Sequence, residues 1–285
     1  MAAQNDIEAK ASWREAGKCY RHVDFQKAID AYKNAIQLNL DADRFGQAAR
    51  LQEEIGDMLA EDDHLDEAIE AYEQSADYYE AENDTGNKNK RLLKVAHMCG
   101  KAKKWEKAIK IFENTAKASA DNNLLRWKVK EYIFKAMLLN ICMLAEDDIV
   151  KKKNIKWPQA GKTINERYCD ISDIYASSRE CKLIIQLLDC LPTEIQEFKD
   201  AIASYDRICK LETWNFELVY FIEKYMEDKQ HEAPDLDVGF GGDDGGDGGY
   251  GDNDEQKEET APTQKHNPFD QQVSQQDLAD APDLL

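Results

Sequence analysis

Three segments of the chain repeat at a constant offset of forty residues. They read FQKAIDAYKNAIQL at 25–38, LDEAIEAYEQSADY at 65–78 and WEKAIKIFENTAKA at 105–118. The register is kept by small, branched and aromatic side chains, namely Ala28/Ala68/Ala108, Ile29/Ile69/Ile109 and Tyr32/Tyr72/Phe112. A fixed period of this size is typical of stacked helical hairpins, in which each unit buries its apolar face against its neighbours. The sequence therefore predicts an all-α array with an extended surface, which favours a binding protein over an enzyme.

Each repeated segment follows another helix-like segment, at 12–24, 46–62 and 89–103. Ala16, Gly56 and Ala96 keep the same spacing and would let the two helices of a hairpin approach closely. Further helices are predicted at 124–146, 164–176, 179–190, 194–210 and 212–227, the last of them a strongly apolar closing cap of the array. The predicted organisation is hairpin repeats at 1–146, an irregular insertion at 147–163, a helical bundle at 164–230 and a disordered acidic tail at 231–285.

Charge is distributed unevenly along the 285 residues. The formal net charge is −20, and the segment from Glu232 onward holds 15 acidic and 2 basic residues, a net of −13, which leaves −7 for the first 231 residues. Such acidity opposes general binding to nucleic acid or to an anionic membrane, so basic contacts would have to be local. The Gly- and Asp-rich tail has too few apolar groups to offset the entropy of ordering it. The start of the chain is too polar for a signal peptide, and the seven scattered cysteines fit reduced thiols in the cytosol.

No pattern of catalytic residues is present in the sequence. The five histidines are isolated, and there is neither a nucleophile elbow nor a phosphate-binding loop. The glycine–aspartate run of the tail lacks the regular nine-residue spacing of calcium-binding repeats, and Lys151–Lys153 beside Trp157 fit a solvated loop better than a nucleic-acid patch. We therefore expect no enzymatic activity, no cofactor, no metal and no nucleic-acid partner.

Basic residues recur with the same forty-residue period, at Lys10, Arg50, Lys90 and Lys130. Each would occupy the same place in successive hairpins, so together they would form a row of positive charge on one face. Two interpretations remain open for this row. It is either a solvated helix edge or a docking track for an acidic, elongated partner.

Several strings in the sequence together resemble one known family. DEAIEAYEQSADYY (66–79), NKRLLKVA (89–96), WEKAIKIFE (105–113), SRECKL (178–183) and YDRICKLETW (205–214) are similar to the soluble NSF attachment proteins, and nearest to their alpha type. The resemblance covers about residues 11–228. It implies a TPR-like, right-handed α-solenoid of antiparallel hairpins that ends in a helical bundle. It also implies an adaptor that coats the four-helix SNARE complex, with its syntaxin-like and other SNAREs, and recruits the hexameric ATPase NSF to disassemble it.

The resemblance assigns roles to individual residues. The family's basic SNARE-facing positions fall on Arg44, Arg50, Lys90, Lys94, Lys130 and Arg179. Its NSF contacts fall on Asp189 and Glu194 and on the C-terminal Leu284 and Leu285. The implied setting is vesicle fusion and intracellular protein transport, including ER–Golgi transport, in the cytoplasm with peripheral membrane contact.

Departures from the family pattern leave alternatives open. The chain begins where the family's third hairpin would be, so we expect a shortened form without the leading hairpins and their apolar membrane-touching loop. Such a form could act as a competitive inhibitor of the cycle rather than as an active adaptor. The predicted insertion at 147–163 falls where another acidic NSF contact would lie. The tripeptide Asn267-Pro268-Phe269 matches the motif that EH domains bind, which suggests an endocytic or trafficking scaffold as a further alternative.

Overall fold

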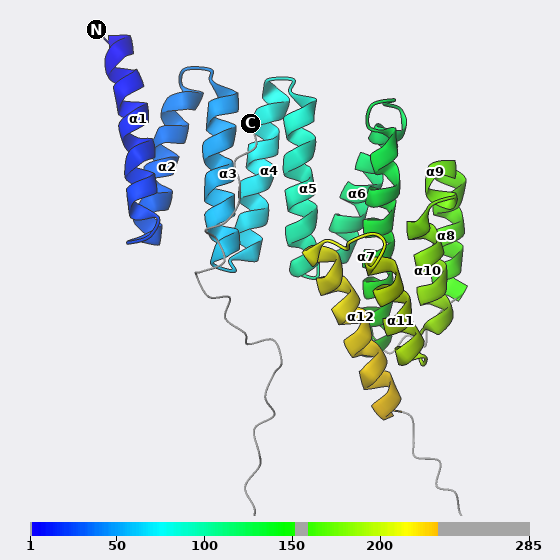
Figure 1. The fold of residues 1–285 in the computed structure, drawn as a ribbon. Helices are drawn as coiled ribbons and strands as arrows, with labels where there is room; N and C mark the ends of the chain where they lie inside the picture. The colour runs from blue at the N-terminus through cyan, green and yellow to red at the C-terminus, as the bar shows by residue number, and fades with distance from the viewer. Residues whose placement is uncertain (1, 152–158, 233–285) are drawn as a thin grey trace, which may run out of the picture. The chain divides into compact units, whose positions relative to one another are not determined.

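The computed structural model describes residues 2–151 and 159–232 of the chain, and within these residues every regular element is a helix. The fold is the predicted all-α array of antiparallel hairpins, closed by a C-terminal group of helices (Figure 1). The helices are α1 (Ala2–Tyr20), α2 (Phe25–Leu40), α3 (Phe45–Glu61), α4 (Leu65–Ala81), α5 (Thr85–Lys101), α6 (Trp105–Ala120), the 3₁₀ helix η1 (Arg126–Lys128), α7 (Val129–Lys151), α8 (Gln159–Ile171), α9 (Asp173–Ala176), α10 (Arg179–Cys190), α11 (Ile195–Asp206) and α12 (Thr213–Glu232).

The four turns that join α2, α3, α4, α5 and α6 share one conformation, which recurs every twenty residues. Asp43, Asp63, Asn83 and Lys103 all have positive φ, between 55° and 60°. The residue after each donates its backbone N–H back into the preceding helix, as in the bonds from Arg44 to the Asn39 carbonyl and from Lys104 to the Cys99 carbonyl, at 2.9 and 2.8 Å. Such a left-handed residue closes the helix by satisfying its last carbonyls. A helix and its turn therefore occupy twenty residues, which accounts for the forty-residue hairpin period.

The repeated positions form the core of the hairpins, as predicted. All nine of the register residues, from Ala28 to Phe112, are buried. Two glycines let the helices of a hairpin approach closely, because each faces a tyrosine ring: a Cβ at Gly56 would lie 2.8 Å from the Tyr72 ring, and one at Gly17 would lie 2.9 Å from Tyr32. The prediction placed the small residue of the first hairpin at Ala16, which is only half-buried. Neighbouring positions point about 100° apart on a helix, so Gly17 rather than Ala16 faces the ring.

Helix α7 is the centre of the C-terminal group. It packs against α6, α8, α9, α10 and α12, and every residue from Tyr132 to Cys142 is buried. Because other helices surround α7, this part of it has no face that is open to solvent. Even Lys135 is buried, with its side chain 4% exposed, and its ammonium lies 3.0 Å from Glu131 and 2.8 Å from Glu212.

Helix α12 joins this group to the hairpins through Trp214. The Trp214 ring lies 4.7 Å from His97 and 5.7 Å from Phe112, measured between ring centres. Its indole N–H donates to the His97 carbonyl at 3.1 Å. Gly100 leaves room for the indole, because a Cβ there would lie 2.7 Å from it. The Trp-led helix thus closes the array on α5 and α6 while it also packs on α7.

Several predicted boundaries were wrong. The irregular insertion at 147–163 is helical at both ends, since α7 runs to Lys151 and α8 begins at Gln159. The helix predicted at 12–24 spans Ala2–Tyr20 instead, so its last residues form the turn. The helix predicted at 164–176 is divided at Ser172, whose hydroxyl accepts a hydrogen bond from the Tyr175 N–H at 3.4 Å and starts α9.

The predicted tail at 231–285 lies almost entirely outside the described residues. Helix α12 continues through Glu232, so residues 231 and 232 belong to it. The prediction of disorder for the remainder concerns residues that the structure does not describe.

Candidate binding surface

Three cations of the forty-residue row lie on the first helices of successive hairpins, and the fourth lies on α7, the helix that follows them. Lys10 is on α1, Arg50 on α3, Lys90 on α5 and Lys130 on α7. Arg50 and Lys90 are each the sixth residue of their helix and are exposed. Lys130 is the second residue of α7, because the connection from α6 is longer than the other turns. Lys10 and Lys130 are half-buried.

A hollow of about 400 Å³ between α1 and α3 gathers the first of these cations. Its charged and amide lining residues are Lys10, Arg14, Asn39, Arg44, Gln47, Arg50 and Glu54. Two of the predicted SNARE-facing residues, Arg44 and Arg50, are therefore brought together here. Four cations face one carboxylate, so the hollow is positive within an acidic chain.

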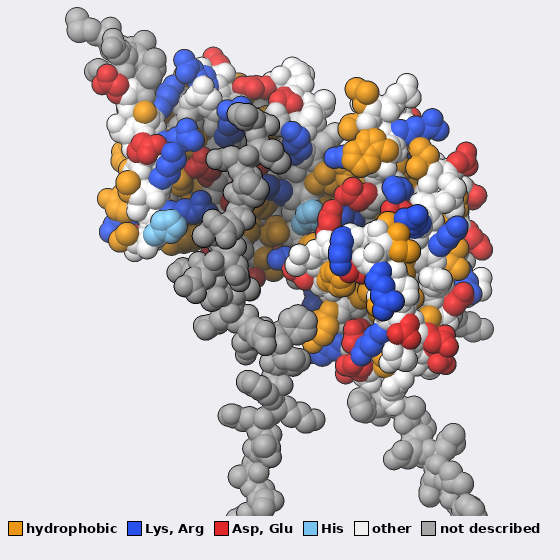
Figure 2. Space-filling model, viewed as in Figure 1, with side chains coloured by type: hydrophobic (Ala, Val, Ile, Leu, Met, Phe, Trp, Pro, Cys, Tyr) orange, Lys and Arg blue, Asp and Glu red, His pale blue; other side chains and the backbone are white. Residues whose placement is uncertain are grey.

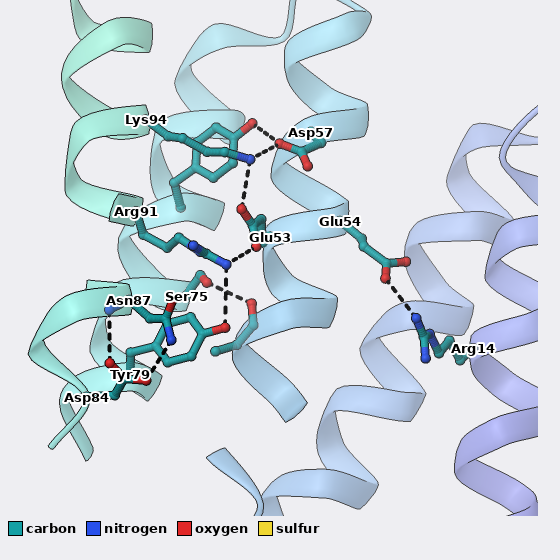
Figure 3. A network of polar contacts seen from close by, with 12 residues as sticks. Arg14, Glu53, Glu54, Asp57, Ser75, Tyr79, Asp84, Asn87, Arg91 and Lys94 are labelled. Atoms are coloured by element: carbon teal, nitrogen blue, oxygen red, sulfur yellow. Dashed lines mark hydrogen bonds and ion pairs between the residues drawn. The ribbon is translucent and has the colours of Figure 1, made fainter. Parts of the chain in front are cut away.

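The hollow contains two features that the sequence prediction missed. Arg14 adds a cation to it, and its guanidinium lies 3.5 Å from Glu54 (Figure 3). Asn39 is buried, and among the described residues its side-chain oxygen has no hydrogen-bond donor. A buried acceptor without a partner is costly, and a ligand that brings an N–H or O–H group would satisfy it.

Lys94, another predicted contact, belongs to a network between α3 and α5. Its ammonium lies 2.8 Å from Glu53 and 2.7 Å from Asp57, and Arg91 pairs with the same Glu53 (Figure 3). Although burial opposes it, these hydrogen bonds to Asp57 and Glu53 raise the pKa of Lys94 above its ordinary value. Two cations and two carboxylates balance one another here. Lys94 is thus held in an internal pair, unlike the exposed Arg50 and Lys90.

The starts of α7 and α10 bring the last two predicted cations together. The Lys130 ammonium lies 2.9 Å from the Glu180 carboxylate, and Arg179 precedes Glu180 in the chain as the first residue of α10. Burial opposes ionisation of Glu180, but the hydrogen bond and charge of Lys130, together with the hydrogen bonds of Glu180 to the backbone and to Ser178, lower the pKa of this carboxyl. Ser178 caps the helix by accepting the Cys181 N–H at 3.1 Å. Arg179 is exposed, and its guanidinium lies 3.5 Å from the Cys209 sulfur.

The predicted NSF contacts lie where α10 ends and α11 begins. Asp189 and Glu194 are both exposed, and Asp189 lies 2.6 Å from the Lys162 ammonium of α8. Burial raises the pKa of the Cys190 thiol, and the nearby charges of Glu197, Asp189 and Glu194 raise it further. Glu197 is therefore a third acid at this end, one that the sequence prediction missed. Leu284 and Leu285, like Asn267, Pro268 and Phe269, lie outside the described residues.

Two ion pairs between neighbouring hairpins could have been predicted from the spacing of charges in the sequence. Arg14 pairs with Glu54, and Arg21 pairs with Glu61 at 2.7 Å, each across forty residues. Opposite charges one period apart therefore predict these contacts. On the face shown in Figure 2, Lys and Arg side chains alternate with Asp and Glu side chains and do not form one block.

In the described part of the chain, no group of three or more His, Cys, Asp and Glu side chains is placed to hold a metal ion. No described helix combines the length and the apolar character needed to cross a membrane.

Comparison with known proteins identifies the family. Residues 1–227 match the family model described as soluble NSF attachment protein, SNAP. This chain is a member of that family. It is 29% identical over 237 residues to the alpha-soluble NSF attachment protein of Vitis vinifera, which covers 83% of this chain and 78% of the relative. It is 32% identical over 229 residues to the beta-soluble NSF attachment protein of Bos taurus, with 80% and 72% covered. A probable vesicular-fusion protein sec17 homolog of Schizosaccharomyces pombe is 28% identical over 227 residues, with 79% and 74% covered.

The SNAP match extends over both predicted contact regions of the folded part. It includes the cations of α1, α3, α5 and α7 and the acids between α10 and α11, and it ends at residue 227. Everything after that residue, including the terminal leucines, is outside the matched range.

Proposed function

We propose that this SNAP family member is an adaptor that binds assembled SNARE four-helix bundles and recruits the ATPase NSF to disassemble them. The observation that carries this proposal is the placement of Lys10, Arg50 and Lys90 on the first helices of successive hairpins, with Lys130 on α7, the next helix after them. SNARE bundles are acidic over much of their surface, so a row of cations along an elongated array is complementary to a charged rod. The function would be that of a vesicle-fusion factor, in line with the name of the sec17 homolog, and we place it on the cytoplasmic side of membranes.

The predicted SNARE-facing cations differ in whether they are exposed or already paired with a carboxylate of the chain. Arg44, Arg50 and Lys90 are exposed, whereas Lys94 and Lys130 are already paired. An exposed ion pair contributes only about 0–1 kcal/mol, so the array has to sum several of them. We therefore assign the larger contributions to the hollow between α1 and α3 and to Lys90, and smaller ones to Lys94 and Lys130.

The other end of the chain supplies the contact with NSF in this proposal. Asp189, Glu194 and Glu197 would meet basic residues of the ATPase, and Leu284 and Leu285 would help to stimulate ATP hydrolysis. The adaptor itself hydrolyses nothing in this scheme, and the mechanical work belongs to NSF.

The test is a pull-down of assembled SNARE complexes by the full chain. Reversing two exposed cations of the row, in Arg50→Glu/Lys90→Glu, is expected to abolish binding while the helical circular dichroism stays unchanged. The matched control is Lys33→Glu/Lys110→Glu, which makes the same change of charge at exposed positions of α2 and α6. Full binding by the row variant, or equal loss in the control, would remove the row from the mechanism.

A reconstituted disassembly assay separates an active adaptor from an inhibitor. The full chain with NSF, ATP and SNARE bundles is expected to release the individual SNAREs. Bundle binding without release, together with inhibition of an added active relative, would identify a competitive inhibitor instead.

A further inference from the structure

The hollow between α1 and α3 differs from the equivalent place one hairpin later, between α3 and α5. Forty residues after Asn39 and Leu51 stand Tyr79 and Arg91. The Arg91 guanidinium lies 5.0 Å from the centre of the Tyr79 ring, donates to its hydroxyl at 3.4 Å and pairs with Glu53 (Figure 3). Between α1 and α3 the two corresponding side chains are shorter, and a hollow of about 400 Å³ remains.

The charges in the hollow are not balanced by the chain. Of its four cations, only Arg14 has a carboxylate beside it, that of Glu54 at 3.5 Å. Among the described residues, no carboxylate forms an ion pair with Lys10, Arg44 or Arg50. Like charges that share a hollow repel one another, so an anion placed between them would be stabilised.

The equivalent place between α3 and α5 has its own counter-charges. The residue forty positions after Arg44 is Asp84, whose carboxylate accepts the Asn87 N–H at 2.9 Å at the start of α5. Lys94, forty positions after Glu54, lies 2.7 Å from Asp57. Repetition of the hairpin alone therefore does not account for the unpaired cations between α1 and α3.

A buried amide adds a second kind of group to the hollow. Asn39 lines it and is 3% exposed. Its side-chain N–H donates to the Ala35 carbonyl at 2.8 Å, whereas its side-chain oxygen has no donor among the described residues. A hydroxyl group of a bound molecule would supply that donor. The hollow thus combines cations from α1, α3 and the turn before α3 with one unsatisfied acceptor.

We propose that this hollow binds a small soluble molecule with several phosphate groups and free hydroxyl groups, of the inositol polyphosphate class. Guanidinium groups bind phosphate through paired N–H donors, and three of the four cations are arginines. The volume is that of a small-molecule pocket. The acidity of the whole chain opposes its approach to an anionic bilayer, which favours a soluble molecule over the same headgroup on a lipid.

Binding in the hollow has a consequence for the proposed function. Arg44 and Arg50 are also predicted to face the SNARE bundle, so a molecule bound between them would compete with the bundle. This competition rests on the proposed function, but the binding itself does not.

The experiment is isothermal titration calorimetry of the full chain with myo-inositol trisphosphate. The wild type is expected to bind one molecule, and unphosphorylated myo-inositol is expected not to bind. Arg14→Gln/Arg44→Gln should weaken binding at least about tenfold, because two guanidinium–phosphate contacts are lost. Arg126→Gln/Arg207→Gln is the matched control, since it also removes two exposed arginines but outside the hollow. It should bind like the wild type.

A second variant separates the hollow from general surface charge. Asn39→Tyr introduces the residue found at the equivalent position of the next hairpin and leaves every cation in place. It is expected to abolish binding by filling the hollow. Retained binding by this variant, no binding by the wild type, or equal losses in the two arginine variants would overturn the proposal. Binding to vesicles with phosphatidylinositol bisphosphate but not to the free trisphosphate would overturn the soluble source. Circular dichroism checks that each variant keeps its helices.

A pull-down of SNARE bundles with and without the trisphosphate distinguishes this inference from the proposed function. Saturating trisphosphate is expected to reduce capture of the bundles, and unchanged capture would refute the competition. Capture of bundles by a wild type that does not bind trisphosphate would overturn the inference alone. Trisphosphate binding by a wild type that captures no bundles would overturn the proposed function alone.

Discussion

The hairpins of α1–α6 and the group of helices from α7 to α12 are built in different ways. In the hairpins, each helix contacts mainly its neighbours in sequence, and ion pairs such as Arg21–Glu61 link one repeat to the next. In the C-terminal group, α7 is surrounded by helices from distant parts of the chain, and its buried polar side chains are paired. The Asn140 amide, for example, donates to the Tyr168 hydroxyl at 3.0 Å, and that hydroxyl donates to Glu113 at 2.7 Å.

This difference indicates how each part serves the proposed function. A periodic stack places like residues at like positions, so a row of cations arises from repetition alone. A packed group fixes single residues by specific contacts, as with Arg179 beside the Lys130–Glu180 pair. The hairpins therefore suit an extended partner, and the C-terminal group suits a local one.

The largest expected effect is at the junction of the two parts. Trp214→Ala removes the ring that packs on His97 and Phe112 and leaves a cavity beside Gly100. We expect a loss of about 3–5 kcal/mol in the free energy of unfolding, measured by urea denaturation. Phe216→Ala on the same helix is the control, because this ring is exposed. A loss no larger than that of the control would mean that the two parts are held together elsewhere.

A smaller effect is expected from pH at the same junction. Burial, together with the nearby ammonium groups of Lys135 and Lys101, lowers the pKa of His97 to about 4, although the Glu212 carboxylate opposes the shift. The histidine is neutral in both states above its unfolded pKa of about 6.5. Below that pH the unfolded chain takes up the proton and the folded chain does not until about pH 4, so stability falls as the pH drops through this window.

The measurement is urea denaturation of the wild type and of His97→Met at pH 7 and pH 5. The wild type is expected to lose about 2 kcal/mol more than the variant between these pH values. Equal losses would mean that His97 is accessible to protons in the folded state and that the junction is looser than its ring contacts indicate.

The smallest effect is expected for a pair that links two hairpins. A double-mutant cycle on Arg21→Gln and Glu61→Gln should give a coupling free energy of about 0.5 kcal/mol, because both side chains are partly in solvent. This coupling free energy should decrease in high salt, because salt screens exposed charges. A coupling several times larger would show that the hairpins are held together by their charges rather than by buried residues such as Tyr72.

Periodicity made the hairpins predictable. The positions of Ala28, Ile29 and Tyr32 repeat in each unit and are buried in each, so the helix face and its core followed from the sequence. The ends of the helices could not be predicted in the same way. The residue with positive φ is Asp, Asn or Lys in different turns, so no single residue type identifies it. In α7 the run from Tyr132 to Cys142 is buried on every side and has no polar face to orient it.

The candidate site was predictable only in part. The forty-residue spacing indicated the row of cations, but not that Lys94 is already paired with Glu53 and Asp57. Which carboxylate lies beside a given cation depends on contacts between hairpins, as with Arg14 in the hollow. The periodic pattern did not predict that Leu124 and Leu125, in the connection between α6 and α7, are exposed, because these residues lie where the forty-residue period ends.

The row of cations is tested most directly by the salt dependence of binding between the purified full chain and assembled SNARE bundles. Association constants would be measured for the wild type and for Arg50→Glu/Lys90→Glu from low to high ionic strength. We expect tight binding at low salt that weakens steeply as salt is added, and little binding by the variant at any salt. Failure of the wild type to bind at low ionic strength, where such attraction is greatest, would contradict the account.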